Sequence, residues 1–400
     1  MSDRLLIYVT ALVRATTTGF VGVALGLYLA RAGQSTATTG AVISAGLAGA
    51  AVAAIFATLF ADRVGRRRFL AGTAFIGAVG TVAFVSTTDP TALVLASFVA
   101  MLNGMGRDRG AALILEQAAL PATTDDAGRT RAFAWYTMLQ DLGHGLGALL
   151  AGLPSVVADT GSSAGAGEHR VAFLLCVGVI LATIPAYLRM GSAVEEGASG
   201  PRQRLSPRSR SILFRISALF SVDSLAGGFL TTALLSYFFF ERFGASELAI
   251  GGLFFAARLL NAVSHLAAAW LAARIGLVNT MVFTHIPSSL LLVTVAFAPS
   301  FAIGAVLFLL REGLVEMDVP TRQSYVLAVV LPEERTAASG VTNLVRLAAW
   351  AVSPVLAGTL MRPESLYLPL VIGAAMKISY DLLLWKAFRS VKPPEEGSAA

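Results

Sequence analysis

Charged and titratable side chains interrupt the long apolar stretches of this 400-residue chain, and they are the residues that could do chemistry. An ionised side chain removed from water needs an opposite charge, a polar cavity or a proton, because an unpaired buried charge is costly. Such groups can bind a polar solute, exchange ion pairs or carry protons. The candidates for such a site are Arg14, Arg107, Asp108, Asp141, His144, Asp223, Arg258, Glu316, Asp318 and Arg346.

The spacing of the titratable residues suggests pairs on single helix faces. Asp141 and His144 are three residues apart, so they would form either a proton relay or a structural hydrogen-bonded pair. Lys377 and Asp381 are four residues apart, and we interpret them as a structural pair. The sequence therefore predicts chemistry inside the apolar stretches rather than in the loops.

Composition indicates where these residues must lie. Hydrophobic residues make up 56% of the chain and charged residues only 14%, whereas about a quarter of a soluble domain is charged. The apolar runs are about 20 residues long, the length of a membrane-spanning helix, and do not alternate as barrel strands do. The single Cys176 excludes a disulfide framework and a thiolate metal site. We predict an all-α membrane protein.

Hydropathy predicts twelve spans and one linker, which must position the charged residues. The linker is rich in Gly, Ser, Pro and Arg, so we expect a six-helix bundle at 1–190, a cytoplasmic linker at 191–212 and a second six-helix bundle with a short tail at 213–400. The predicted spans are 5–30, 40–60, 69–87, 91–114, 131–153, 171–190, 213–239, 247–272, 277–298, 301–328, 338–360 and 366–386.

Loop charges predict the orientation. The net charge of +6 could indicate a nucleic-acid partner, but the Arg residues lie mainly in short loops between spans. Placing both termini in the cytoplasm gives an inside excess of Lys and Arg of about fourfold. We expect a monomer in the bilayer of the bacterial cytoplasmic (inner) membrane, without nucleic acid. The loops left outside hold Arg31, Arg170, Arg242 and Arg362.

The two halves are weakly repeated in sequence. Short matches recur in the same order at a separation of about 210 positions, which is typical of transporters built from two parallel repeats. At this separation Arg14 corresponds to Asp223, and Arg107 corresponds to Asp318. These residues could pair across a cavity between the halves and exchange partners during a transport cycle. The alternative is a set of structural pairs within each half.

A basic loop follows the second predicted span and contains Asp62, Arg63, Gly65, Arg66 and Arg67. The order D-R-x-G-R-R, with twelve spans and a central linker, resembles the major facilitator superfamily of transporters. The resemblance implies two six-helix bundles related by pseudo-two-fold symmetry around a central cavity. It also implies a gating role for the first four of these residues. The family pattern begins a few residues before this motif, with Gly and often Leu at the positions where this chain has Thr58 and Phe60.

The resemblance and the intramembrane charges together predict a secondary active transporter that works by alternating access, not an enzyme. No nucleotide-binding motif is present, so we expect a proton gradient to drive transport and no cofactor. A glycine-rich fifth span resembles part of the antiporter motif of drug exporters, which favours proton-coupled export of a small solute. The arginines favour the alternative, proton-coupled uptake of a polar or anionic solute, and they are Arg14, Arg107, Arg109, Arg258, Arg311 and Arg346.

Other functions remain as alternatives. Met281 and His285 are four residues apart in the ninth span and, with scattered methionines, could bind a soft metal such as copper. Methionine at helical spacing is more often packing. A membrane enzyme or a receptor is a non-transport alternative, but the loops are short and poor in His.

Overall fold

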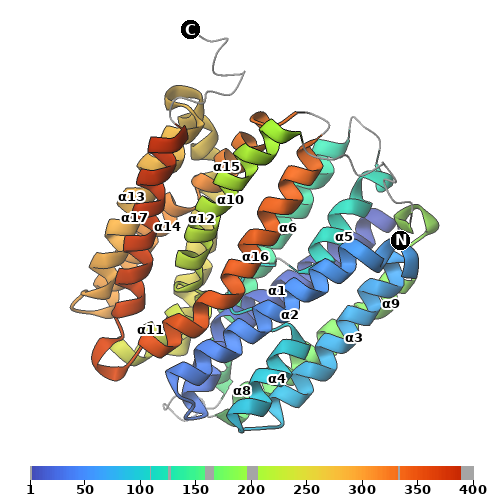
Figure 1. Ribbon diagram of the computed structural model, residues 1–400. Helices are drawn as coiled ribbons and strands as arrows, with labels where there is room; N and C mark the ends of the chain where they lie inside the picture. Colours follow the sequence, from blue (N-terminus) through green and yellow to red (C-terminus); the bar gives the residue numbers. More distant parts are fainter. Residues whose placement is uncertain are drawn as a thin grey trace. The chain divides into compact units, whose positions relative to one another are not determined.

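The computed structural model of the chain describes residues 2–108, 110–124, 128–157, 166–195, 206–331 and 334–388, and every regular element within them is a helix (Figure 1). Nine helical stretches of this described part are long and apolar enough to cross a membrane. The α-helices are α1 (Asp3–Arg31), α2 (Thr36–Val64), α3 (Arg66–Val85), α4 (Pro90–Ala100), α5 (Ala111–Ala119), α6 (Arg129–Leu150), α7 (Leu153–Val157), α8 (Ala166–Leu181), α9 (Ile184–Leu188), α10 (Pro207–Gly228), α11 (Thr232–Phe243), α12 (Glu247–Ile275), α13 (Leu277–Ala296), α14 (Phe301–Val315), α15 (Asp318–Ala328), α16 (Arg335–Leu360) and α17 (Leu368–Phe388). The short 3₁₀ helices are η1 (Leu120–Thr123), η2 (Ser192–Glu195) and η4 (Pro363–Ser365).

The helices form two compact units. Unit 1 contains the described residues of Met1–Ser199 together with Thr231–Arg258 and Pro354–Arg362. Unit 2 contains the described residues of Gly200–Leu230, Leu259–Ser353 and Pro363–Ala400. The division falls within α12 and α16. The domain boundaries at 190 and 212 stay predictions.

In unit 1, α1 and α6 pack with their backbones in direct contact. A Cβ atom added to Gly19 would lie 2.1 Å from the carbonyl oxygen of His144, and one added to Gly147 would lie 1.9 Å from that of Thr16. Small residues at such crossings let helices approach closely in membranes. This contact fixes α1, which carries Arg14, against α6, which carries His144.

Elements from the second half of the sequence complete unit 1. A Cβ atom on Gly26 of α1 would lie 2.1 Å from the carbonyl oxygen of Ala233 in α11. Near the end of α16, the N–H of Val355 donates to Ser44 Oγ of α2 at 2.9 Å. The helices α1 and α2 are thus held to the parts of α11 and α16 that belong to the same unit.

The fourth predicted span is not one continuous helix, and the prediction of a single helix over 91–114 is wrong. Helix α4 ends at Ala100, Met101 takes a left-handed conformation with φ 55°, and α5 starts only at Ala111. Gly106 has φ +64°, which glycine adopts readily. Glycine and asparagine in the sequence Asn103-Gly-Met-Gly are weak helix formers, and the freed backbone groups are bonded by neighbouring elements.

Unit 2 is built around an apolar core to which α10, α13, α15, α16 and α17 contribute, with Phe220, Tyr325 and Tyr380 among its buried side chains. The tenth predicted span consists of α14 and α15, interrupted at Glu316 and Met317. The seventh span is likewise divided between α10 and α11, and the sixth between α8 and α9. Each of the remaining predicted spans lies mainly on one helix.

Candidate functional site

Arg14 of α1 is held by two carboxylates inside unit 1. Its Nε donates to Asp108 Oδ2, and its two terminal nitrogens donate to Glu116 of α5 at 2.5 and 2.8 Å. The side chain of Glu116 is fully buried, and that of Arg14 is 12% exposed. A two-pronged contact between guanidinium and carboxylate is among the strongest hydrogen-bonded pairs in proteins. Arg14 is therefore fixed in place.

Glu116 also accepts three neutral hydrogen bonds. The hydroxyl groups of Tyr136 and Tyr187 each donate to it at 2.9 Å, and Thr10 Oγ1 donates at 3.1 Å. These donors come from α6, α9 and α1, so Glu116 joins three helices to α5. A carboxylate with this many donors is well satisfied away from water. We call Arg14, Asp108, Glu116, Tyr136 and Tyr187 the Arg14 cluster.

Asp108 and His144 meet at the edge of the Arg14 cluster. The N–H of Asp108 donates to His144 Nε2 at 3.0 Å, and Asp108 Oδ1 accepts from the N–H of Gly110 at 3.2 Å. His144 thus contacts the interrupted fourth span, and the sequence analysis had paired it with Asp141. Asp141 lies three residues earlier on α6 and is half-buried.

The non-helical segment between α4 and α5 is described at residues 101–108 and 110, is called segment 101–110, and is held by the second-half elements of unit 1. Its carbonyl groups at Gly104, Met105 and Gly106 accept hydrogen bonds from the Ala233 N–H, Thr232 Oγ1 and Arg258 Nη2, at 3.0, 2.8 and 3.2 Å. Arg258 therefore donates a hydrogen bond to the backbone of this segment. The carbonyl of Arg107 accepts from Asn103 Nδ2 at 2.5 Å, and Arg109 lies outside the described residues.

Asp223 of α10 is the centre of a second charged cluster, in unit 2. Lys377 Nζ of α17 lies 2.9 Å from Asp223 Oδ1. Arg322 Nη1 of α15 and Arg346 Nη2 of α16 lie 3.4 and 3.6 Å from Asp223 Oδ2. Arg322 also pairs with Asp318. One buried carboxylate is thus shared by three cations.

His285 of α13 extends this cluster. Lys377 Nζ lies 3.1 Å from His285 Nε2, and His285 Nδ1 lies 3.0 Å from Asp381 Oδ1. An ammonium group only donates, so the ring accepts at Nε2 and donates from Nδ1 to Asp381. The result is a continuous chain of polar contacts from Asp381 through His285 and Lys377 to Asp223. We call Asp223, Asp318, Arg322, Arg346, His285, Lys377 and Asp381 the Asp223 cluster.

The structure gives Lys377 and His285 different partners from those suggested by spacing. Lys377 and Asp381 were interpreted as a direct pair, but the His285 ring lies between them. Both ring nitrogens of His285 are engaged in these contacts, which argues against the proposed copper site with Met281. Among the described residues, no group of three or more His, Cys, Asp or Glu is placed to hold a metal ion.

A smaller group of polar residues lies on α14, which precedes α15 in the sequence. Glu312 pairs with the adjacent Arg311 and accepts from Asn261 Nδ2 of α12 at 3.1 Å. Glu316, one of the predicted site residues, is half-buried at the interruption between α14 and α15. It is therefore placed where the backbone of the tenth span leaves the helix.

The basic loop between α2 and α3 is a tight turn at Gly65, which has φ +95°. Arg66 Nε pairs with Asp62 Oδ1 at 2.9 Å, although the Asp62 side chain is 69% exposed. Glu195 of η2 accepts from the Arg66 N–H at 2.5 Å and from Arg67 Nε at 2.8 Å. Arg66 is buried rather than solvated, whereas Arg63 is exposed.

Glu195 is a partner that the sequence analysis missed. Partial burial acts to raise its pKa, but hydrogen bonds from the Arg67 side chain and from the N–H groups of Arg66 and Arg67 outweigh it and hold the pKa below its usual value. A carboxylate at the start of α3 also suits the positive end of the helix dipole. Glu195 thus anchors the beginning of the linker to the loop.

Helices that carry paired charges inside apolar spans define a polytopic membrane protein of the transporter class. The family model of the Major Facilitator Superfamily matches residues 7–395, and the chain belongs to this superfamily of transporters. It is 24% identical to the uncharacterized membrane protein YJR124C of Saccharomyces cerevisiae, over 97% of this chain and 94% of that protein.

Solved structures show the same fold at low sequence identity. The nucleoside transporter NupG has a TM-score of 0.74 at 15% identity, covering 97% of this chain and all of that one. The xylose transporter XylE from E. coli, in a partially occluded inward-open conformation, has a TM-score of 0.72 at 12% identity, covering 99% of each chain. The all-α major facilitator fold predicted from the sequence is confirmed.

Proposed function

We propose that this protein is a proton-coupled secondary transporter that exports a small solute by alternating access. The supporting observation is the Asp223 cluster, in which one buried carboxylate is shared by three cations. The three cations favour the ionised form of Asp223, so it can take a proton only as these cations move away from it, and proton uptake and rearrangement of the cluster must occur together.

Arg346 is the cation of this cluster that is best placed to bind a solute. Its 3.6 Å distance to Asp223 is the longest of the three, and its guanidinium carbon lies 4.7 Å from the centre of the Trp350 ring. A guanidinium that rests on an aromatic face is free to turn its N–H groups toward a polar or anionic group. We therefore assign solute contact to Arg346 and proton binding to Asp223.

Uptake of a polar or anionic solute is a second candidate. The names of the two structural neighbours NupG and XylE concern polar solutes, namely nucleosides and xylose. Arg346 would serve such a solute equally well. We further propose, from the loop charges, a monomer in the bacterial cytoplasmic membrane with both termini in the cytoplasm.

Purified protein in proteoliposomes tests the proposal. A panel of nucleosides, sugars, peptides and hydrophobic cations is offered with a pH gradient imposed in either direction. Antiport predicts that solute moves uphill against the proton flow, whereas solute moving with the protons supports the uptake candidate. The exposed Glu364→Gln variant is the matched control for carboxylate substitutions. Transport that ignores the gradient would contradict proton coupling.

A further inference from the structure

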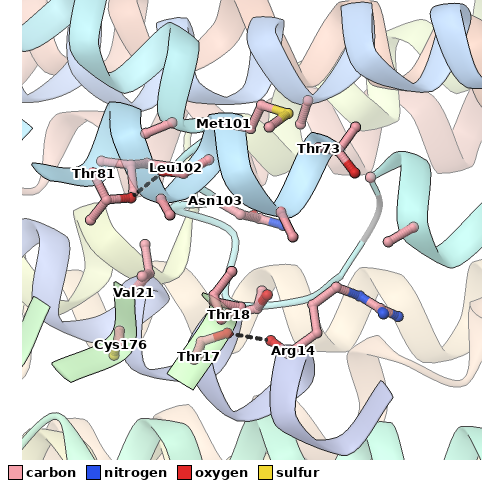
Figure 2. A pocket seen from close by; sticks show the side chains of 18 of the residues that line it. Arg14, Thr17, Thr18, Val21, Thr73, Thr81, Met101, Leu102, Asn103 and Cys176 are labelled. Carbon is pink, nitrogen blue, oxygen red and sulfur yellow. Dashed lines mark hydrogen bonds between the residues drawn. The ribbon is translucent and has the colours of Figure 1, made fainter. Parts of the chain in front are cut away.

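Unit 1 contains a cavity of about 180 Å³ that extends from the Arg14 cluster along α1 and α3 (Figure 2). It lies among α1, α3, α8 and the non-helical segment 101–110, and the Arg14 cluster closes one end. Figure 2 shows Thr17 and Thr18 of α1 on one side, with Met101 to Asn103 and Thr73 on another. All its lining residues belong to unit 1.

The cavity exists because the fourth span leaves the helix. The segment 101–110 is drawn toward α1, where a Cβ atom on Gly22 would lie 2.3 Å from Gly106 Cα. On the other side, α3 presents the small residues Ala74, Gly77 and Ala78. The small side chains of this part of α3 leave the space between the two walls open.

The walls predict the chemistry of an occupant. The two charged lining residues, Arg14 and Asp108, are paired with each other. The hydroxyl groups of Thr73 and Thr81 already donate to backbone carbonyls, at 3.1 and 2.8 Å. The rest of the lining is mainly apolar. Such a pocket favours a neutral, mostly apolar molecule, because a charged one would lose its hydration without gaining a partner.

We propose that this cavity is a binding site for a neutral, mostly apolar small molecule, which locks the fourth span in its interrupted form. The occupied cavity supports the segment whose carbonyl groups bind Thr232, Ala233 and Arg258. A ligand in the cavity stabilises these contacts. It therefore disfavours any conformation of the transporter in which they are broken, and so slows the transport cycle. This inhibitory effect rests on the proposed function, whereas the binding site does not.

Cys176 is the only cysteine of the chain and lines the cavity, so it provides a native reporter. The probe is N-ethylmaleimide, a small neutral molecule. The Cys176 sulfur adds to its carbon–carbon double bond and the neighbouring carbon takes the proton, so nothing is released. Full-length protein in proteoliposomes is labelled and the adduct measured by mass spectrometry. N-Ethylsuccinimide, which has the same shape without the double bond, should compete and slow labelling in a saturable manner.

Two variants of α3 show whether labelling depends on the cavity. A Cβ atom at Gly77 would make ordinary contacts, 3.5 Å from the Ala100 carbonyl oxygen, so Gly77→Leu fills the cavity without a clash at the backbone. We expect it to slow labelling at least tenfold. The matched control Gly72→Leu lies outside the lining on the same helix, and its labelling should be unchanged. Ala74→Leu is a second filling variant should Gly77→Leu fail to fold.

Transport measurements test the lock. Labelled protein should lose at least fivefold in transport rate, and Cys176→Ser should be insensitive to the reagent. Leu175 is 67% exposed, so Leu175→Cys in the Cys176→Ser background should be labelled without loss. Equal labelling of Gly77→Leu, Ala74→Leu and the parent protein, or no protection by N-ethylsuccinimide, would overturn the site. Full transport by the adduct would overturn the lock, and absence of transport in untreated protein would instead contradict the proposed function.

Discussion

The Arg14 cluster and the Asp223 cluster are charged centres of opposite construction. In unit 1 one cation lies between two carboxylates, and tyrosine and threonine hydroxyls complete the coordination of Glu116. In unit 2 the central carboxylate of Asp223 lies among three cations, at distances that increase from 2.9 to 3.6 Å, and one of these cations, Arg322, also pairs with Asp318. The first arrangement is closed and fully bonded, whereas the second contains a loosely held member.

This difference assigns different tasks to the two clusters. Short, two-pronged contacts with neutral donors around them hold a backbone in place. Three cations that compete for one carboxylate can redistribute when that carboxylate takes a proton. We therefore assign the Arg14 cluster to holding the interrupted fourth span, and the Asp223 cluster to coupling. The four substitutions below separate these tasks, because each makes a different demand on stability and transport.

Arg14→Gln should have the largest effect. It leaves Asp108 and Glu116 without their shared cation, and stranding buried charge costs about 3–5 kcal/mol. Thermal unfolding in detergent should show a large fall in the melting temperature. The control Glu364→Gln removes an exposed charge and should leave the melting temperature unchanged. A stable, folded Arg14→Gln protein would show that this cluster does not hold the unit together.

His285→Leu should have an intermediate effect. It removes the hydrogen-bond donor to Asp381 and the acceptor for Lys377, and an unsatisfied buried polar group costs about 1–3 kcal/mol. A double-mutant cycle with Asp381→Leu should give a coupling energy of about 1 kcal/mol, because the two side chains touch. Strictly additive losses would mean that the chain of contacts through His285 has no energetic role.

Arg346→Gln should separate transport from stability. Asp223 keeps Lys377 and Arg322, so no buried carboxylate is left without a cation and the melting temperature should fall less than in Arg14→Gln. Transport rate should nevertheless fall at least tenfold, because Arg346 is the proposed solute contact. Transport at the parent rate would show that Arg346 does not contact the solute. The proposed difference in task between the two clusters would then lose its support.

Glu195→Gln should have the smallest effect, and it should depend on pH. The pKa of Glu195 is lowered in the folded protein, so its stabilising contribution is fully present above its ordinary pKa of 4.5, decreases below that value and is lost once the pH falls through the lower pKa of the folded state. Its side chain is 25% exposed, so we expect less than about 1 kcal/mol at pH 7. The difference in melting temperature between the two proteins should shrink at pH 4. A difference independent of pH would assign the effect to packing.

Sequence periodicity and composition predicted where the helical spans lie, because each span is a local property of about 20 residues, but not the breaks within four of them. The charges in those spans were also found, because an ionised group in an apolar run is conspicuous. The interruption at 101–110 was not predicted, although Asn103, Gly104 and Gly106 were visible as a weak stretch. Its conformation depends on hydrogen bonds from Thr232 and Arg258, which lie far away in the sequence.

The pairing of charges was less predictable. Glu116 was missed because the fourth span was expected to end at residue 114, whereas α5 continues to Ala119. His285 was considered for copper, yet its position between Lys377 and Asp381 follows from the packing of α13 against α17. Glu195 was missed because its partners are the backbone N–H groups of Arg66 and Arg67. Packing between helices determines such partners, and spacing along one helix does not.

Uphill transport by Asp223→Asn tests the assignment of coupling to the Asp223 cluster most directly. The variant keeps the shape of the side chain but removes the charge that the three cations share. In proteoliposomes with an imposed pH gradient, we predict that the parent protein concentrates its solute and that Asp223→Asn only equilibrates it. Asp223→Asn protein that still concentrates solute as the parent does would contradict the account.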